Sequence, residues 1–224
     1  MNVYFWILRL AALLGHKKAR KLVKGQRAAM AELQEWASTL NGEQVLWFHA
    51  ASVGEFEQVR PIIERLSNEL PFDRVLLTFF SPSGYELRKN YDLVDKVTYL
   101  PFATRRNAKK LLNILPLKAA VMVKYEFWPA YLKVLKKNDI PTYLISAIFR
   151  PGQLFFLPWG RGYRRLLHCF NHIYVQDQAS KELLQRYGVE TVSVAGDTRF
   201  DRVTEVRKAA KELPLVEQFV AGSQ

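Results

Sequence analysis

The segment HAASVGE, at positions 49–55, combines small residues with a carboxylate that could accept a proton. Ser52 and Gly54 would let a ligand approach the backbone closely, because their side chains take little space. Glu55 opens a predicted helix, whose dipole favours the charged carboxylate, so we expect its pKa to be low. A carboxylate that is ionised at neutral pH can act as a general base. The spacing alone fits a simple charge at a helix start, with Ser52 as the cap, better than it fits catalysis.

The segment KYEFWP, at positions 124–129, places Lys124, Glu126 and two aromatic residues in one predicted turn between a strand and a helix. An aromatic wall with a charged group at its end is a common way to hold a sugar, so the segment could bind one. A structural interpretation is equally good. In that interpretation Trp128 is buried against Pro129, and the two charged side chains are simply solvated.

A third segment, SPSGYE at positions 81–86, contains Ser83 and Gly84 where a strand is predicted to run into a helix. Free backbone N–H groups at such a turn can contact an anion. Turns of this kind are common in α/β proteins, so the indication is weaker than at the other two segments.

Several common ligand-binding motifs do not occur in the sequence, among them GxGxxG, GxxxxGK[ST] and HExxH. The usual dinucleotide, P-loop and zinc-protease sites are therefore unsupported, and no motif links the chain to nucleic acid. Cys169 is the one cysteine, which excludes a disulfide framework. It lies near His168 and His172, but a small buried hydrophobe is a better interpretation than a metal ligand. We expect neither a metal ion nor a cofactor.

The elements that position these segments are predicted by the hydrophobic pattern. Short apolar runs predict strands at 45–48, 74–78, 96–100, 119–123, 142–145, 172–175 and 192–194. A period near 3.6 predicts helices at 55–70, 83–90, 107–115, 129–138 and 178–187. This alternation indicates an α/β fold, a Rossmann-like parallel sheet with helices on both faces. Ligands bind beyond the carboxyl ends of such strands, where all three segments lie.

The N-terminal residues 1–24 predict a helix that lies on a membrane surface. Positions 3–14 are apolar apart from Arg9, and a basic block follows at positions 16–27. The apolar stretch is shorter than the ~20 residues that span a bilayer. An interfacial helix that meets anionic headgroups fits better, although a helix packed on its own domain is the alternative. The net charge of +12, from 33 Lys+Arg against 21 Asp+Glu, also favours polyanionic partners.

The remaining sequence divides into three parts. Residues 25–200 are predicted to form the Rossmann-like domain, and residues 201–214 a connecting helix. Residues 215–224 resemble the first strand of a second domain that the chain does not complete. A chain of this composition, 49% hydrophobic, can bury a substantial core.

Taken together, the segments resemble the Kdo transferase family, inverting glycosyltransferases with the two-domain B-type fold. The resemblance rests on WFHAASVGE (47–55), TFFSPSGYE (78–86), YLPF (99–102), KYEFWP (124–129), VQDQAS (175–180) and GDTRFD (196–201). HAASVGE together with KYEFWP at this separation is specific. The resemblance implies that this chain is the N-terminal, acceptor-binding half of such a fold.

The resemblance also implies an activity. The family transfers 3-deoxy-D-manno-octulosonic acid (Kdo) from CMP-Kdo to a lipid A precursor, in lipopolysaccharide biosynthesis at the cytoplasmic face of the bacterial inner membrane. CMP-Kdo would bind mainly through a C-terminal donor domain, and this half alone would be inactive. The family's catalytic base matches Glu55, which reverses the preference from spacing alone. We assign substrate binding to Ser52, Gly54, Ser83, Gly84, Lys124, Glu126 and Arg150.

The chain departs from the family pattern at three places. Ala103 follows YLPF where many members have aspartate, and GDTRFD has Asp197 and Arg199 where GNxKFD is common. After the strand at 142–145, Ile148 stands where an arginine is often found, and Arg150 could replace it. Contacts at these positions cannot be carried over from the family.

Two other functions stay open on the sequence. One is a B-type glycosyltransferase with another nucleotide-sugar donor. The other is a non-enzymatic, basic, membrane-binding module.

Overall fold

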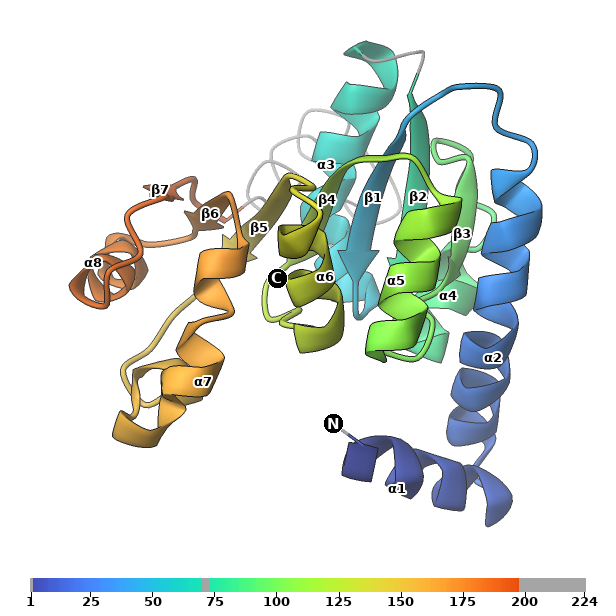
Figure 1. The fold of residues 1–224 in the computed structure, drawn as a ribbon, viewed down its shortest axis with the longest axis horizontal. Coiled ribbons are helices and arrows are strands. Elements are labelled where there is room, and N and C mark those ends of the chain that lie inside the picture. The colour runs from blue at the N-terminus through green and yellow to red at the C-terminus, as the bar shows by residue number, and fades with distance from the viewer. Residues whose placement is uncertain (1, 70–72, 198–224) are drawn as a thin grey trace, which may run out of the picture.

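The computed structural model describes residues 2–69 and 73–197, which form a parallel sheet covered by helices on both faces (Figure 1). The strands are β1 (Val45–Ala50), β2 (Arg74–Phe79), β3 (Lys96–Tyr99), β4 (Leu117–Val123), β5 (Thr142–Ala147), β6 (His172–Val175) and β7 (Val192–Val194). Every strand pairs in parallel with its neighbours, and each predicted strand is present. The predicted fold class is therefore confirmed.

The five helices predicted after β1 lie close to their expected positions, and further helices precede β1 or lie between β5 and β6. They are α1 (Asn2–Leu13), α2 (Lys17–Ala37), α3 (Val53–Glu69), α4 (Pro82–Arg88), α5 (Arg105–Ile114), α6 (Pro129–Lys137), α7 (Arg161–Arg164) and α8 (Gln178–Arg186). Residues at the ends of the helices explain where several of them begin. Thr104 caps α5 by accepting a hydrogen bond from the N–H of Asn107 at 3.1 Å, and Pro129 occupies the first turn of α6.

The two faces of the sheet carry separate cores. Val45 and Trp47 of β1 point to one face and pack with residues of α2, α5 and α6. Leu46 and Phe48 point to the other face and pack with residues of α3. All four side chains are buried, which explains why the strand reads as a continuous apolar run rather than an alternating one.

The order of the strands in the sheet is β3-β2-β1-β4-β5-β6-β7. The chain moves outward from β1 to β3, returns to place β4 beside β1, and then moves outward in the other direction. The direction reverses between β1 and β4. In open α/β sheets a crevice forms at this point, beyond the carboxyl ends of the two strands.

The N-terminal region forms two helices instead of the single element predicted over residues 1–24. A turn at Leu14 and Gly15 separates α1 from α2, and the basic block lies mostly on α2, which continues past residue 24 without a break. Within the described residues no helix combines the length and apolar character needed to cross a membrane. The predicted connecting helix at 201–214 and the strand at 215–224 lie outside the described residues.

The long connection between β5 and β6 contains short helical turns that the sequence did not predict. These are η1 (Leu154–Phe156), η2 (Pro158–Gly160), the short helix α7 and η3 (Leu167–Cys169). In Figure 1, α7 and α1 lie at the end of the molecule to which the strand arrows point. The carboxyl edge of the sheet therefore has α1 on one side and α7 on the other.

Candidate active site

The crevice between β1 and β4 brings together the two segments that carry acidic residues. HAASVGE begins within β1 and enters α3, and KYEFWP connects β4 with α6. Because β1 and β4 are neighbours in the sheet, Glu55 and Glu126 come from opposite sides of the reversal point. The pairing of these distant segments is the central feature of the site.

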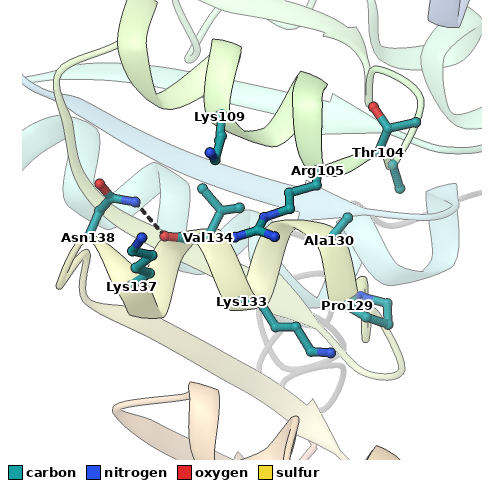
Figure 2. Close-up of a pocket in the computed structure, with 10 residues that line it drawn as sticks. Thr104, Arg105, Lys109, Pro129, Ala130, Lys133, Val134, Lys137 and Asn138 are labelled. Carbon is teal, nitrogen blue, oxygen red and sulfur yellow. Dashed lines mark hydrogen bonds between the residues drawn. The ribbon is translucent and has the colours of Figure 1, made fainter.

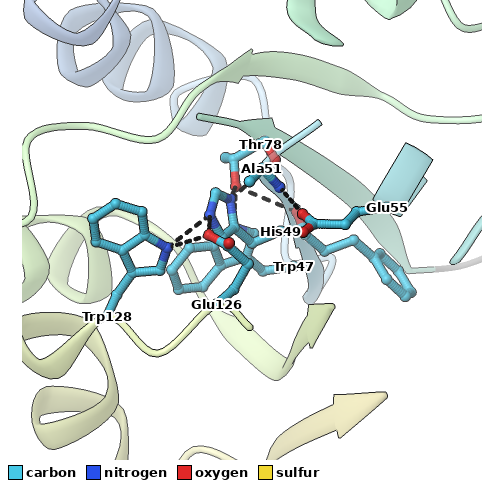
Figure 3. Close-up of polar contacts among 8 residues, drawn as sticks. Trp47, His49, Ala51, Glu55, Thr78, Glu126 and Trp128 are labelled. Atoms are coloured by element: carbon cyan, nitrogen blue, oxygen red, sulfur yellow. Dashed lines mark hydrogen bonds and ion pairs between the residues drawn. The ribbon is translucent and has the colours of Figure 1, made fainter. Parts of the chain in front are cut away.

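A buried histidine of β1 connects β2 with the KYEFWP turn (Figure 3). His49 is 0% exposed, and its Nε2 lies 2.9 Å from Oε2 of Glu126. Its Nδ1 lies 2.9 Å from Oγ1 of Thr78 and 3.1 Å from the Thr78 carbonyl oxygen. The carbonyl can only accept, so Nδ1 carries a proton. The indole N–H of Trp128 also donates a hydrogen bond to Nε2, at 3.0 Å.

The aromatic residues of the site complete this hydrogen-bond network. Trp128 donates its indole N–H to Oε2 of Glu126 at 2.6 Å, and its ring contacts that of Phe80 at a centroid distance of 5.2 Å. Trp47 donates its indole N–H to Oγ1 of Thr78 at 2.8 Å. Glu126 is thus held in place by two side chains and is only 8% exposed. The interpretation of Glu126 as simply solvated is therefore wrong.

Glu55 lies in the first turn of α3, and its Oε2 accepts a hydrogen bond from the Ala51 N–H at 2.5 Å. Burial raises the pKa of Glu55, and the charge of Glu126 raises it further. The Ala51 N–H, His49 and Lys124 oppose this shift but do not overcome it. The predicted low pKa is therefore wrong. The carboxyl group is withdrawn from water and lies close to a second acid, and these two effects outweigh those that lower its pKa.

Lys124 stands directly after β4 in a left-handed backbone conformation, with φ 59°, and its N–H donates to the Ile145 carbonyl at 2.9 Å. Ser146, at the end of the neighbouring strand β5, has φ 53°. Such conformations cost free energy in residues other than glycine and occur often at functional sites. Lys124 is near enough to act electrostatically on Glu55, which places it in the same crevice.

The other predicted binding residues divide into exposed and structural positions. Ser52 starts α3 through its carbonyl, which accepts from the Phe56 N–H at 3.0 Å, and Gly54 is exposed with nothing within 4 Å of an added Cβ. The Ser83 hydroxyl pairs with that of Ser81 at 2.6 Å. Gly84 is buried, and a Cβ there would come within 2.6 Å of the Phe79 ring. Packing therefore accounts for this glycine without a ligand.

Arg150 is not brought to the crevice by any contact within the described residues. It is exposed in the connection that follows β5, and its backbone N–H donates to the Gln153 side chain at 3.2 Å. The crevice itself therefore unites Glu55, Lys124 and Glu126, with Ser52 and Gly54 at its exposed side.

Comparisons with known proteins agree with this geometry. A sequence profile described as 3-Deoxy-D-manno-octulosonic-acid transferase (kdotransferase) matches residues 21–202. The 3-deoxy-D-manno-octulosonic acid transferase of Aquifex aeolicus is 30% identical over 188 residues, which are 83% of this chain and 48% of that protein. The chain belongs to the Kdo transferase family. It spans about half the length of the curated relatives that it matches.

Solved structures with a similar fold come from enzymes that are named for another activity. The UDP-GlcNAc 2-epimerase of Methanocaldococcus jannaschii aligns with a TM-score of 0.56 at 18% identity, over 81% of this chain and 53% of that one. The Neisseria meningitidis enzyme, solved with UDP-GlcNAc, aligns with a TM-score of 0.57 at 17% identity, over 78% and 52% of the two chains. At these identities the likeness concerns the fold alone, and it agrees with one half of a B-type fold.

In this member of the Kdo transferase family, sequence reasoning missed the residues that support the acids. His49 and Thr78 were assigned no role, although each is a polar residue inside an otherwise apolar strand. That position was the available signal, because a buried polar group needs a partner. Cys169 is buried as predicted. Within residues 2–69 and 73–197 no group of three or more His, Cys, Asp or Glu could hold a metal ion.

Proposed function

We propose that the protein containing this chain transfers Kdo from CMP-Kdo to a lipid A precursor in lipopolysaccharide biosynthesis. The observation that carries the proposal is the meeting of Glu55 and Glu126 in the crevice between β1 and β4, with the pKa of Glu55 raised by burial and by its neighbour. Membership of the Kdo transferase family supports Kdo as the transferred sugar. This chain would form the acceptor side of the reaction.

In the proposed reaction, Glu55 in its charged form accepts a proton from a sugar hydroxyl of the acceptor, the 6′-hydroxyl in the family's substrate. The acceptor oxygen then forms a bond with the anomeric carbon of Kdo, while the bond from that carbon to the CMP phosphate oxygen breaks. A raised pKa makes Glu55 a stronger base, provided that the carboxylate is still the main form at the working pH. His49 and Trp128 hold Glu126 in place, and its charge adds to the effect of burial, which raises the pKa of Glu55.

We further propose that the reaction uses neither a metal ion nor a cofactor, and that CMP-Kdo binds mainly through residues outside the described part of the chain. A chelator should then leave turnover unchanged. The positive side chains near the crevice, of which Lys124 is one, would face the phosphates and carboxylates of the substrates.

The location that we propose is the cytoplasmic face of the inner membrane, where α1 would lie on anionic lipid. The apolar side chains of α1 are unusually exposed for a folded protein: Trp6 is 68% and Leu13 79% exposed. A hollow of about 670 Å³ between α1 and α2 is lined by both apolar and basic side chains, including Arg9 and Lys24. That combination suits a lipid with an anionic headgroup.

A second exposed aromatic patch supports the same orientation. Trp159 is 75%, Tyr163 48% and Leu154 38% exposed, in the connection that contains α7. Arg161 and Arg165 stand beside them and are exposed as well. Since α1 and α7 lie at the same end of the molecule (Figure 1), contact through both would turn the crevice toward the membrane.

The experiment that tests the proposed function uses the full-length protein with CMP-Kdo and a lipid A precursor. Formation of a product heavier by one or more Kdo residues, detected by mass spectrometry, is expected. A parallel reaction with other nucleotide sugars tests the alternative donor. Product from another donor, with none from CMP-Kdo, would overturn the proposal.

A further inference from the structure

A basic groove separates α5 from α6, on the face of the sheet opposite to α3 (Figure 2). It encloses about 540 Å³ and is lined by Ala103, Thr104, Arg105, Lys109, Pro129, Ala130, Lys133, Val134, Lys137 and Asn138. Four of these residues are cations, and no lining residue is acidic. In Figure 2 the side chains of Arg105 and Lys109 extend from α5 toward α6.

The four cations form two rows along the groove. Arg105 and Lys109 are four residues apart on α5, and Lys133 and Lys137 are four residues apart on α6. Residues at this spacing lie on the same side of a helix, so the charges within each row repel. All four residues line the same hollow, although the Lys133 side chain extends away from α5 at its edge (Figure 2). The folded protein thus keeps like charges together at a cost.

Some basic residues elsewhere in the described part of the chain have acidic partners. Arg74 pairs with Glu43 at 2.7 Å and with Asp95 at 3.0 Å, and Arg88 pairs with Glu57 at 2.6 Å. Within the described part of the chain, none of the four groove cations forms an ion pair. The fold therefore neutralises some of its cations internally, and the four cations that line the groove stay available to an external anion.

The ends of the two helices add to the positive potential of the groove. Both α5 and α6 begin at its mouth, where Arg105 and Pro129 lie. The first turns of both helices direct N–H groups and the positive end of the helix dipole to this end. Trp128, which precedes α6, provides no side-chain cap for those N–H groups. The mouth begins only three residues after Glu126, so the groove opens beside the crevice.

We propose that this groove binds a phosphate monoester, carried either by a soluble compound or by a lipid headgroup. A phosphate monoester carries more than one negative charge and three acceptor oxygens at neutral pH, which matches several converging cations. Four residues, about 6 Å along the axis, separate the charges of each row, so one phosphate can contact two neighbouring cations of a row. If the phosphate belongs to a lipid, the proposal deepens the proposed function and rests on it. The binding of a phosphate monoester in the groove does not depend on the proposed function.

The test compares two charge-matched double variants of the purified chain. Lys109→Gln with Lys137→Gln removes one cation from each wall of the groove. Lys110→Gln with Lys136→Gln removes one cation from each of the same helices, one position along, outside the groove. All four side chains are exposed, so both variants should fold like the wild type, as circular dichroism can verify.

Affinity for glycerol 3-phosphate is measured by isothermal titration calorimetry, without any sugar donor. The groove variant should bind at least about tenfold more weakly, because each charged hydrogen bond is worth about one order of magnitude in affinity. The control variant should change little, since exposed charges contribute little at a distance. Equal weakening in both variants, or no binding by the wild type, would overturn the proposal, whether or not the full-length protein transfers Kdo.

Vesicles distinguish the two sources of the phosphate. Phosphatidylcholine vesicles that contain phosphatidate carry a monoester, and those with phosphatidylglycerol at equal surface charge carry a diester. Stronger binding to phosphatidate, lost in the groove variant, supports a lipid-borne phosphate. Tight binding of glycerol 3-phosphate without a preference for phosphatidate supports a soluble ligand of the same class.

Discussion

Replacement of Thr78 by valine should lower the free energy of unfolding by about 2 kcal/mol, because it removes the acceptor of a buried N–H group. Valine and threonine have nearly the same shape, so the change leaves no cavity. Thr78 is 0% exposed and lies in β2, between β1 and β3. Its hydroxyl is the group through which Trp47 and His49 are connected.

The magnitude follows from the partners of that hydroxyl. The Trp47 N–H donates to it at 2.8 Å and is itself fully buried, so the variant leaves this donor unsatisfied at a cost of about 1–3 kcal/mol. The loss of the hydroxyl affects His49 less, since its Nδ1 keeps the hydrogen bond to the Thr78 carbonyl oxygen at 3.1 Å. The bond from the hydroxyl to the Phe48 carbonyl is long, at 3.3 Å, and contributes little. A loss of about 2 kcal/mol corresponds to about 4–8 °C in melting temperature.

The assay is urea unfolding followed by circular dichroism, in a double-mutant cycle with Trp47→Phe. Phenylalanine has no N–H, so the cost of Thr78→Val should fall below about 1 kcal/mol in that background. The reasoning is refuted if Thr78→Val costs less than about 0.5 kcal/mol, or if its cost is the same with phenylalanine at position 47.

Three further predictions concern the crevice and its surroundings. Glu126→Gln removes a negative charge beside Glu55 and should therefore lower the pKa of Glu55. The acidic limb of the pH–rate profile of the full-length enzyme should then move to lower pH, and an unmoved limb would contradict the electrostatic effect of Glu126 on Glu55. Gly84→Ala should destabilise the chain by up to about 2 kcal/mol through overpacking, whereas Gly54→Ala should stabilise it by up to about 1 kcal/mol and reduce turnover. Thermal unfolding measures the stability changes and initial rates measure turnover, and equal stability changes in the two variants would contradict the distinction. Trp159→Ser should weaken sedimentation with anionic liposomes while leaving the melting temperature unchanged, and unaltered sedimentation would exclude the second membrane contact.

The arrangement of strands and helices could be predicted because strands such as β1, β2 and β5 are buried along most of their length. An unbroken apolar run such as Val45–Ala50 has few alternatives once helical segments flank it. The connection after β5 resisted prediction for the opposite reason. Its aromatic residues follow neither period, and its short turns are held by packing among rings such as Phe149 and Phe155.

The candidate site was predicted in its parts but not in its connections. The rule that ligands bind beyond carboxyl ends of strands identified Glu55 and Glu126. The contact of His49 with Glu126, however, depends on β1 lying beside β4, and strand order is a long-range property that local spacing does not contain.

The predicted pKa of Glu55 failed for the same physical reason. The helix dipole is a local effect that the sequence reveals, whereas burial and the neighbouring acid come from the folded chain. Gly84 is a parallel case, because the ring that fills the space above it belongs to the preceding strand. The type of each side chain and its place on a helix or strand could be inferred from the sequence. The burial of that side chain and its neighbours from distant segments could not.

The role of Glu55 as the base is tested most directly by single-turnover transfer in the full-length enzyme with Glu55→Gln. Glutamine preserves the size of the side chain and removes its ability to accept a proton. We predict that the rate of the chemical step falls by about two to four orders of magnitude, while acceptor binding and the melting temperature stay close to the wild type. Glu126→Gln is the matched control and should retain more activity. Near-normal turnover by Glu55→Gln, with a larger loss in Glu126→Gln, would contradict the account and place the base in the KYEFWP turn.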